Sequence, residues 1–180
     1  CHINAFSAQW DTLLWRNNNS EVVLTKYLKP ITRKLNPDIS ESSITQAIDI
    51  LTADKSLKNP IEANKEVYEL LRNGIKIQEQ DANTGKFDFK TIKIIDWNNP
   101  KNNHFVIVSQ MWINGELYNR RPDVIAFVNG IPLLLIELKA PNKSLFDAFN
   151  DNIRDYKDTI PQIFWYNAAI IISNGLDNRI

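Results

Sequence analysis

The sequence predicts an α/β (α+β) fold with a mixed central sheet flanked by helices, and three observations lead to this class. Apolar residues recur at helical spacing in the first part of the chain and at alternate positions from Ile75 onward. Residues 121–139, RPDVIAFVNGIPLLLIELK, hold two apolar runs separated by Asn129-Gly130, a strong hairpin signal. A helical pattern and a last apolar run follow, which places helices and strands in one layered domain.

Helices are expected in three segments of the first part of the chain: 20–35, 40–51 and 60–73. Pro30 should kink or divide the first of them. The third has complete end signals, because Asn59 can cap it, Pro60 occupies its first position and Gly74 follows its last residue. Its inward stripe is predicted to be Ile61, Asn64, Val67, Tyr68 and Leu71.

Strands are expected where the period changes to two, in segments 75–79, 86–97 and 104–113, with turns rich in Asn, Gly and Pro between them. The hairpin of 121–139 follows them. Beyond Pro141, Ser144 opens a helix that runs to about Thr159 and that Pro161 ends. One face of this helix is predicted to carry Leu145, Phe149, Ile153 and Tyr156. A final buried strand is expected over 168–172.

The chain is long enough for one compact domain, since it has 180 residues of which 43% are hydrophobic. We expect residues 1–58 to form a helical region that packs on a core of residues 59–180. The chain begins with Cys rather than Met and stops in mid-pattern, so we also expect it to be a piece of a longer protein. No segment resembles a signal peptide or a membrane span.

Charge and cysteine content exclude several classes of protein. Twenty-one basic residues balance 21 acidic residues, so a polyanionic partner would have to be contacted locally or together with other domains. The single cysteine excludes an internal disulfide, and two scattered histidines exclude a zinc-ligand cluster. A reducing cytoplasm fits this composition best.

The hairpin ends in ionisable residues that an apolar strand does not explain. Glu137 and Lys139 are two positions apart and therefore project from one face, and Asp123 lies near the matching end of the partner strand. Two carboxylates suit Mg²⁺, with Mn²⁺ as an alternative, and a phosphodiester is the natural substrate of such a site. Lys139 would position a water molecule or stabilise charge at phosphorus. The rival interpretation is a surface salt bridge at a strand end.

The register of the hairpin gives a structural prediction. A regular two-residue turn at Asn129-Gly130 would put Asp123 opposite Ile136, on the wrong face for Glu137. One extra residue would return Asp123 to the face of Glu137. We therefore predict a one-residue irregularity, either a bulge beside Gly130 or a distortion at Pro122-Asp123.

Residues 121–141, RPDVIAFVNGIPLLLIELKAP, resemble the nuclease signature of the restriction subunit of type I restriction-modification enzymes, in its N-terminal domain of the PD-(D/E)xK superfamily. The resemblance continues through IDWNNPKNNHFVIVSQ and IRDYKDTIPQIFWYNAAIIISNG and covers about 60–178. It implies a restriction-endonuclease-like core with an N-terminal helical region. It also implies Mg²⁺-dependent cleavage of double-stranded DNA after ATP-driven translocation by other domains.

The resemblance also assigns roles to residues. It implies that Asp123 and Glu137 hold the divalent metal, with help from the carbonyl of Leu138, and that Lys139 is the catalytic lysine. The family's Gln-x-x-x-Tyr element falls on Asn152 and Tyr156, where the shorter asparagine leaves the reach of the side chain open. Four further residues are candidates for support of the site or for DNA contact: Glu62 and Glu66, and Lys143 and Arg154.

The same resemblance implies partners and a location. The partners are double-stranded DNA and the specificity and methyltransferase subunits, in a bacterial or archaeal cytoplasm. ATP would act only through domains outside this chain, because no G-x-x-x-x-G-K-[ST] loop occurs here. Two rival functions are a stand-alone repair or resolvase-like nuclease and a non-catalytic docking module. Exposed tryptophans would favour the docking module, although five tryptophans are more often in the core.

Overall fold

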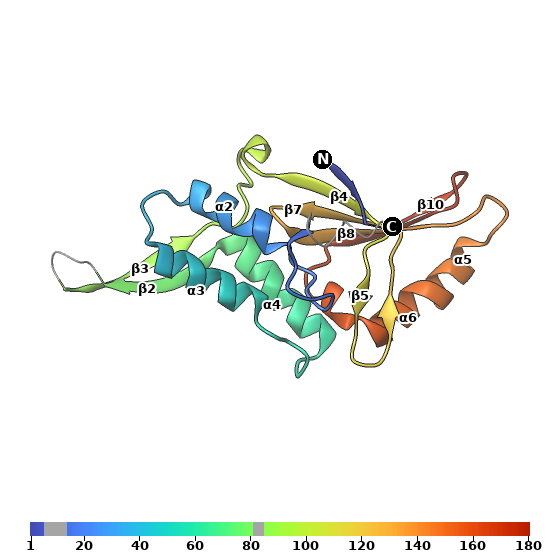
Figure 1. The fold of residues 1–180 in the computed structure, drawn as a ribbon, viewed down its shortest axis with the longest axis horizontal. Coiled ribbons are helices and arrows are strands. Elements are labelled where there is room, and N and C mark those ends of the chain that lie inside the picture. Colours follow the sequence, from blue (N-terminus) through green and yellow to red (C-terminus); the bar gives the residue numbers. More distant parts are fainter. Residues whose placement is uncertain (6–13, 81–84) are drawn as a thin grey trace.

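The computed structural model describes residues 1–5, 14–80 and 85–180, and its centre is a six-stranded mixed sheet (Figure 1). The strands follow the order β1 (His2–Asn4), β4 (Phe105–Ser109), β7 (Val124–Val128), β8 (Ile131–Leu138), β9 (Ala169–Ser173) and β10 (Asn178–Arg179). The pairs β1–β4 and β8–β9 are parallel and the other pairs are antiparallel. Helices flank this sheet, so the predicted fold class is confirmed.

The three N-terminal helices form where their end signals predict them. They are α2 (Thr25–Leu35), α3 (Glu41–Thr52) and α4 (Pro60–Asn73). The Ser40 hydroxyl caps α3 by accepting the Ser43 N–H, and the Asn59 side chain caps α4 by accepting the Ile61 N–H. Gly74 ends α4 with a φ of 77°. Pro30 lies inside α2, which begins later than predicted.

The predicted inward stripe of α4 is only partly right. Val67 and Leu71 are buried, and Ala63 joins them, but Ile61 and Tyr68 are exposed. Asn64 is half-buried because its amide donates to the backbone carbonyls of residues 164, 165 and 167. The helix is therefore rotated so that small Ala63 faces the core in place of the larger apolar residues.

The strands after α4 differ in extent from the three segments that the sequence predicts. β2 (Ile75–Gln80) and β3 (Phe87–Ile92) form a separate two-stranded sheet that projects from the body in Figure 1. The second predicted strand therefore ends at Ile92 rather than at 97. The third splits in two, because the chain turns at Gln110 and a short strand, β5 (Ile113–Asn114), pairs with β6 (Asn119–Arg120).

Residues 1–58 contain the helices α2 and α3 and, in addition, the strand β1, which the sequence did not predict. β1 pairs in parallel with β4 and adds an edge to the main sheet. One continuous core contains residues from both predicted regions, including Ile3 and Leu28 from the first and Val108 and Ile125 from the second. The division at residue 58 stays a prediction.

The single helix predicted over 144–159 is divided into three segments. α5 (Leu145–Ala148) is followed by a π-helical turn (Phe149–Ile153) and by α6 (Arg154–Thr159). Ile153 and Tyr156 are buried as predicted, whereas Phe149 is exposed because the wider turn rotates it off the common face. β9 is less buried than predicted, with only Ile172 in the core.

The hairpin turn is hydrogen-bonded to the segment of the chain that precedes β4. Asn129 and Gly130 have φ values of 54° and 86°, which fit the predicted two-residue turn. The buried Asn129 amide donates to the Ile94 carbonyl and to Asn103, and its oxygen accepts the His104 N–H. The turn is thereby fixed to the chain that precedes β4.

Several large apolar side chains lie at the surface. Of the tryptophans, Trp15, Trp97 and Trp112 are exposed and Trp165 is buried, while Trp10 falls outside the described residues. The expectation that the tryptophans belong to the core is therefore wrong for these three.

None of the helices in the described ranges has the length and apolar character that a membrane crossing requires.

Candidate metal-dependent nuclease site

The two strands of the hairpin contain the irregularity that the sequence predicts. Ala126 on β7 pairs with Leu134 on β8, and the next residue, Phe127, pairs with Pro132. One step along β7 therefore matches two steps along β8, so that Leu133 is the extra residue. This is the two-against-one arrangement of a β-bulge.

The bulge lies within β8, neither beside Gly130 nor at Pro122-Asp123 as proposed from the sequence. Its neighbour Pro132 has no N–H to donate to the ladder, which gives a physical reason for the interruption at this point. Beyond the bulge Val124 pairs with Ile136, and continuing this register by one residue places Asp123 opposite Glu137. Opposed residues on neighbouring strands project from the same face, so the two carboxylates share one side of the sheet.

Asp123 is held by one donor on β8 and by another on the residue that follows β4. The Leu138 backbone N–H donates to Asp123 Oδ2 at 2.8 Å, and Gln110 Nε2 donates to Asp123 Oδ1 at 2.9 Å. The first donor follows Glu137 on β8, and the second lies just past the end of β4. The Asp123 carboxylate is therefore fixed between β4 and β8.

Glu137 is a buried carboxylate with three hydrogen-bond donors. Its side chain is 3% exposed; Lys139 Nζ lies 3.0 Å from Oε1, and the Asn152 amide donates to the same oxygen. The Tyr156 hydroxyl donates to Oε2 at 3.3 Å. Burying an unpaired carboxylate is costly, and these donors offset that cost. Lys139 keeps 24% of its side chain exposed and can meet a ligand from solvent.

Asn152 reaches the site although it is shorter than the glutamine of the family element. It lies in the π-helical turn, and its amide bonds directly to Glu137. Such turns occur mostly as single insertions in α-helices and often at functional sites. Tyr156 belongs to the core, and its hydroxyl also bonds Glu137.

The environment of Tyr156 gives a prediction about pH. Burial raises the pKa of its hydroxyl above the ordinary 10.0, and the charges of Glu137 and Asp123 raise the pKa further. A raised pKa means that the contribution of Tyr156 to stability is complete below about pH 10 and is lost as the pH rises toward the folded-state pKa. We expect the Tyr156→Phe variant to lack one phenol that ionises late in a titration of tyrosinate absorbance.

Tyr166 provides the matched control for this titration. It is also buried with a raised pKa, but its hydroxyl donates to the Leu51 carbonyl, away from Glu137. Tyr166→Phe should likewise remove one late-ionising phenol. Loss of an early-ionising phenol in Tyr156→Phe would contradict the contact with the carboxylates.

A second ion pair joins α6, the helix that carries Tyr156, to β6. The Arg120 guanidinium on β6 donates through two nitrogens to Asp155 on α6, with Nη2 at 2.7 Å from Oδ1. This hydrogen bonding holds the pKa of Asp155 below its ordinary value. Sequence reasoning missed the pair, because 35 positions separate the two residues and neither belongs to the nuclease signature.

The acidic candidates on α4 do not contact the site. Glu62 is exposed at the start of the helix. Glu66 pairs with Lys58 and, at 3.7 Å, with the buried Lys55. Within the described ranges no hydrogen bond or ion pair joins either acid to Asp123 or Glu137.

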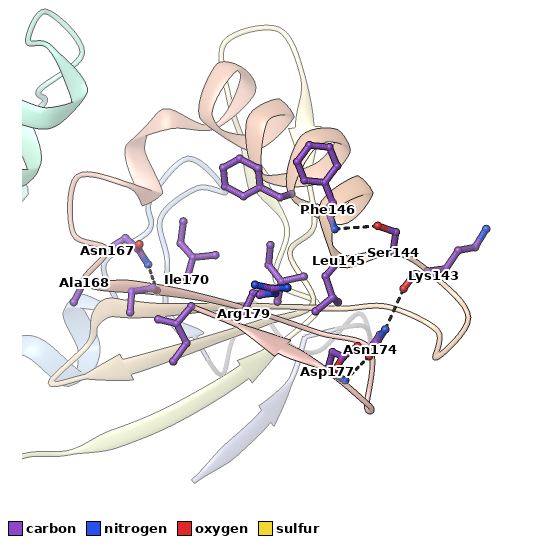
Figure 2. A pocket seen from close by; sticks show the side chains of 14 residues that line it. Lys143, Ser144, Leu145, Phe146, Asn167, Ala168, Ile170, Asn174, Asp177 and Arg179 are labelled. Carbon is purple, nitrogen blue, oxygen red and sulfur yellow. Dashed lines mark hydrogen bonds between the residues drawn. The ribbon is translucent and has the colours of Figure 1, made fainter.

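The two basic candidates lie on exposed surface near the α5–α6 segment. Lys143 accepts a hydrogen bond from Asn174 through its carbonyl, and its side chain points into solvent in Figure 2. Arg154 is exposed on α6. For the part of the chain that the structure describes, neither contacts the three central residues Asp123, Glu137 and Lys139.

A cavity of about 900 Å³ lies between α5 and the β9–β10 pair (Figure 2). Apolar residues including Leu145, Phe146 and Ile170 line it, together with the polar residues Asn174 and Arg179. None of the three ionisable residues of the strand ends lines this cavity. The candidate chemistry therefore belongs to the strand ends, which are more polar, rather than to the cavity.

The residues present fit a magnesium ion. Asp123 and Glu137 supply hard oxygen donors, and every carboxylate oxygen accepts through about two lone-pair positions, so those that already accept one bond keep capacity for another. Across the described ranges no three His, Cys, Asp or Glu residues gather as a ligand group. Mg²⁺ usually takes one or two carboxylates and completes its shell with water and phosphate oxygens.

Comparison with known proteins identifies the chain's relatives. It matches the family described as "Type I restriction enzyme R protein N terminus" over residues 4–180. It is 35% identical over 169 residues to the type I restriction enzyme HindI endonuclease subunit of Haemophilus influenzae, covering 92% of this chain and 16% of that protein. It is 32% identical over 165 residues to the putative type I restriction enzyme MjaIXP endonuclease subunit of Methanocaldococcus jannaschii, covering 88% and 15%.

The chain thus spans about one-sixth of the length of these relatives. The family match covers nearly all of the chain, including every residue of the site described above. The chain belongs to the family of type I restriction enzyme R proteins and corresponds to their N-terminal part.

Proposed function

We propose that this chain is the Mg²⁺-dependent endonuclease domain of a type I restriction enzyme and that its core is of the PD-(D/E)xK type. It would cleave double-stranded DNA after ATP-driven translocation by other domains of the protein. The observation that carries the proposal is the bulge at Leu133, which brings Asp123 to the face of Glu137. The names of the relatives, which are endonuclease subunits, support the same activity.

Each residue of the site has a role in this proposal. Asp123 and Glu137 would hold the metal, which when bound would offset their charge and polarise a phosphoryl oxygen of the DNA. Lys139, paired with Glu137 and partly exposed, would orient the attacking water or stabilise negative charge at phosphorus. Asn152 and Tyr156 would fix the orientation of the Glu137 carboxylate, because both donate to it.

The remaining parts of the proposal concern the assembly. The chain has no net charge, which suits a domain whose DNA is held in part by others. The proposed partners are DNA and the specificity and methyltransferase subunits, in the cytoplasm of a bacterium or archaeon. Lys143 and Arg154 are exposed and are kept as proposed phosphate contacts.

A metal titration with a matched cleavage assay tests the proposal. We expect the full-length protein to bind Mn²⁺ or Mg²⁺ in the millimolar range by calorimetry, and Asp123→Ala to abolish this binding because it removes a ligand. Lys139→Ala should retain the metal and lose cleavage, because the lysine acts on the substrate rather than on the ion.

The assembled restriction complex provides the decisive comparison. A complex that carries alanine at Asp123, Glu137 and Lys139 together, and that still cleaves DNA at the parental rate, would refute the catalytic proposal. That result would favour the docking module instead. Circular dichroism of each variant would show whether a loss of activity reflects a loss of fold.

A further inference from the structure

Gln110 has an unusual backbone for its residue type. It follows the last residue of β4, and its φ is 58°, in the left-handed region that residues with a side chain seldom adopt. Its N–H donates to the Asp123 carbonyl at 2.9 Å. The pairing of Ser109 with Val124 ends immediately before this point, so Gln110 turns the chain away while remaining bonded to Asp123.

The side chain of Gln110 returns to the same residue. Its Nε2 donates to Asp123 Oδ1 at 2.9 Å, while the Leu138 N–H holds Oδ2 from the opposite strand. Gln110 therefore donates hydrogen bonds both to the backbone carbonyl and to the carboxylate of Asp123. Strained backbone that persists at such a point is typical of functional sites, where surrounding contacts hold it.

We infer that Gln110 is a positioning residue, which aims the Asp123 carboxylate toward the position shared with Glu137. This inference rests on the proposed nuclease function and adds a residue to it. A neutral amide can orient a carboxylate without neutralising its charge, whereas a lysine or arginine here would compete with a bound cation. The amide also leaves a further acceptor position on Oδ1.

Asn129, a second polar residue with a left-handed backbone among the described residues, shows the contrasting, purely structural case. Asn129 is fully buried, and its side chain bonds the Ile94 carbonyl, the His104 N–H and Asn103. The groups bonded are two backbone groups and a neutral side-chain amide. Gln110 directs its amide to a carboxylate, which is the pattern of a residue that supports a ligand.

Gln110→Gly tests this inference, because glycine accepts the left-handed backbone and removes only the side chain. We expect the full-length protein with this substitution to bind Mn²⁺ about 10- to 100-fold more weakly by calorimetry, as is usual when a group that orients a metal ligand is lost. The urea midpoint of unfolding should change little. Cleavage should fall at low metal concentration and recover as the metal is raised.

Gln162→Ala is the matched control. Its Nε2 also donates to a single acceptor, the Asn114 carbonyl at 2.8 Å, but outside the site. This variant should bind the metal as the parent protein does. If Gln110→Gly also binds like the parent while Asp123→Ala does not, the positioning role is refuted. If Asp123→Ala itself binds like the parent, the proposed function fails instead.

Discussion

Replacing Glu137 with glutamine is expected to lower DNA cleavage by the intact restriction complex about 100-fold or more. The substitution keeps the shape of the side chain but removes the negative charge that would help to hold the metal and that pairs with Lys139. The measurement is the rate of cleavage of a supercoiled plasmid at fixed metal and ATP concentrations. ATP hydrolysis, proposed to belong to other domains, should continue at the parental rate.

The fold should survive this change. Glu137 is almost fully buried, and a neutral group of equal volume has a smaller desolvation cost than a carboxylate. We expect the free energy of unfolding to stay within about 1 kcal/mol of the parent, since the amide oxygen can still accept a bond from Lys139 or Tyr156.

Glu69→Gln provides the control for the same chemical change. Glu69 is exposed on α4, so its neutralisation should leave cleavage unaltered. Parental cleavage by the Glu137→Gln complex would contradict the assignment of this carboxylate. A parallel loss of ATP hydrolysis would instead point to a defect in assembly.

The elements with local signals were predictable from the sequence. α3 and α4 begin directly after their N-caps, Ser40 and Asn59, and α4 ends before Gly74, because caps depend on residues within one turn. The hairpin at Asn129-Gly130 was predictable for the same reason.

Elements that depend on distant partners were not predictable. β1 has three residues, too few for a periodic pattern, and forms only because β4 offers an edge about 100 positions later, with Ile3 paired to Val108. β2 and β3 alternate as strands should, but an alternating pattern cannot tell which sheet a strand will join. The orientation of α4 was also misjudged, because apolar Ile61 and Tyr68 fit a helical stripe that the core does not use.

The candidate site divides in the same way. Residue types and spacing singled out Asp123, Glu137 and Lys139 as candidates. Because side chains alternate between the two faces of a strand, Asp123 and Glu137 can share a face only if the hairpin holds one extra residue, and the structure contains that residue. The extra residue lies beside Pro132. Asn152 reaches Glu137 from a π-helical turn, and no single residue type predicts such a turn.

Gly130→Ala is expected to produce the largest loss of stability of any change predicted for this chain. An added Cβ would lie 2.3 Å from the Leu24 carbonyl oxygen and 3.1 Å from the Leu28 nitrogen, both backbone atoms at the start of α2. Neither can move without disturbing that helix, and the Leu24 N–H also donates to the Gly130 carbonyl at 2.8 Å. We expect the free energy of unfolding to fall by about 2–5 kcal/mol in urea titrations.

Gly175→Ala separates the two causes of this loss, which are the backbone strain of a left-handed alanine and the clash of its Cβ with α2. Gly175 has nearly the same φ, 83° against 86°, but an added Cβ there would meet no atom within 4 Å. The strain of a left-handed alanine should therefore cost about 1–2 kcal/mol at both positions, and only Gly130→Ala should add the clash with α2. Equal losses in the free energy of unfolding of the two variants would show that the hairpin turn is not in close contact with α2. A larger loss at Gly130 would show that the hairpin turn is packed against the start of α2, at the backbone atoms of Leu24 and Leu28.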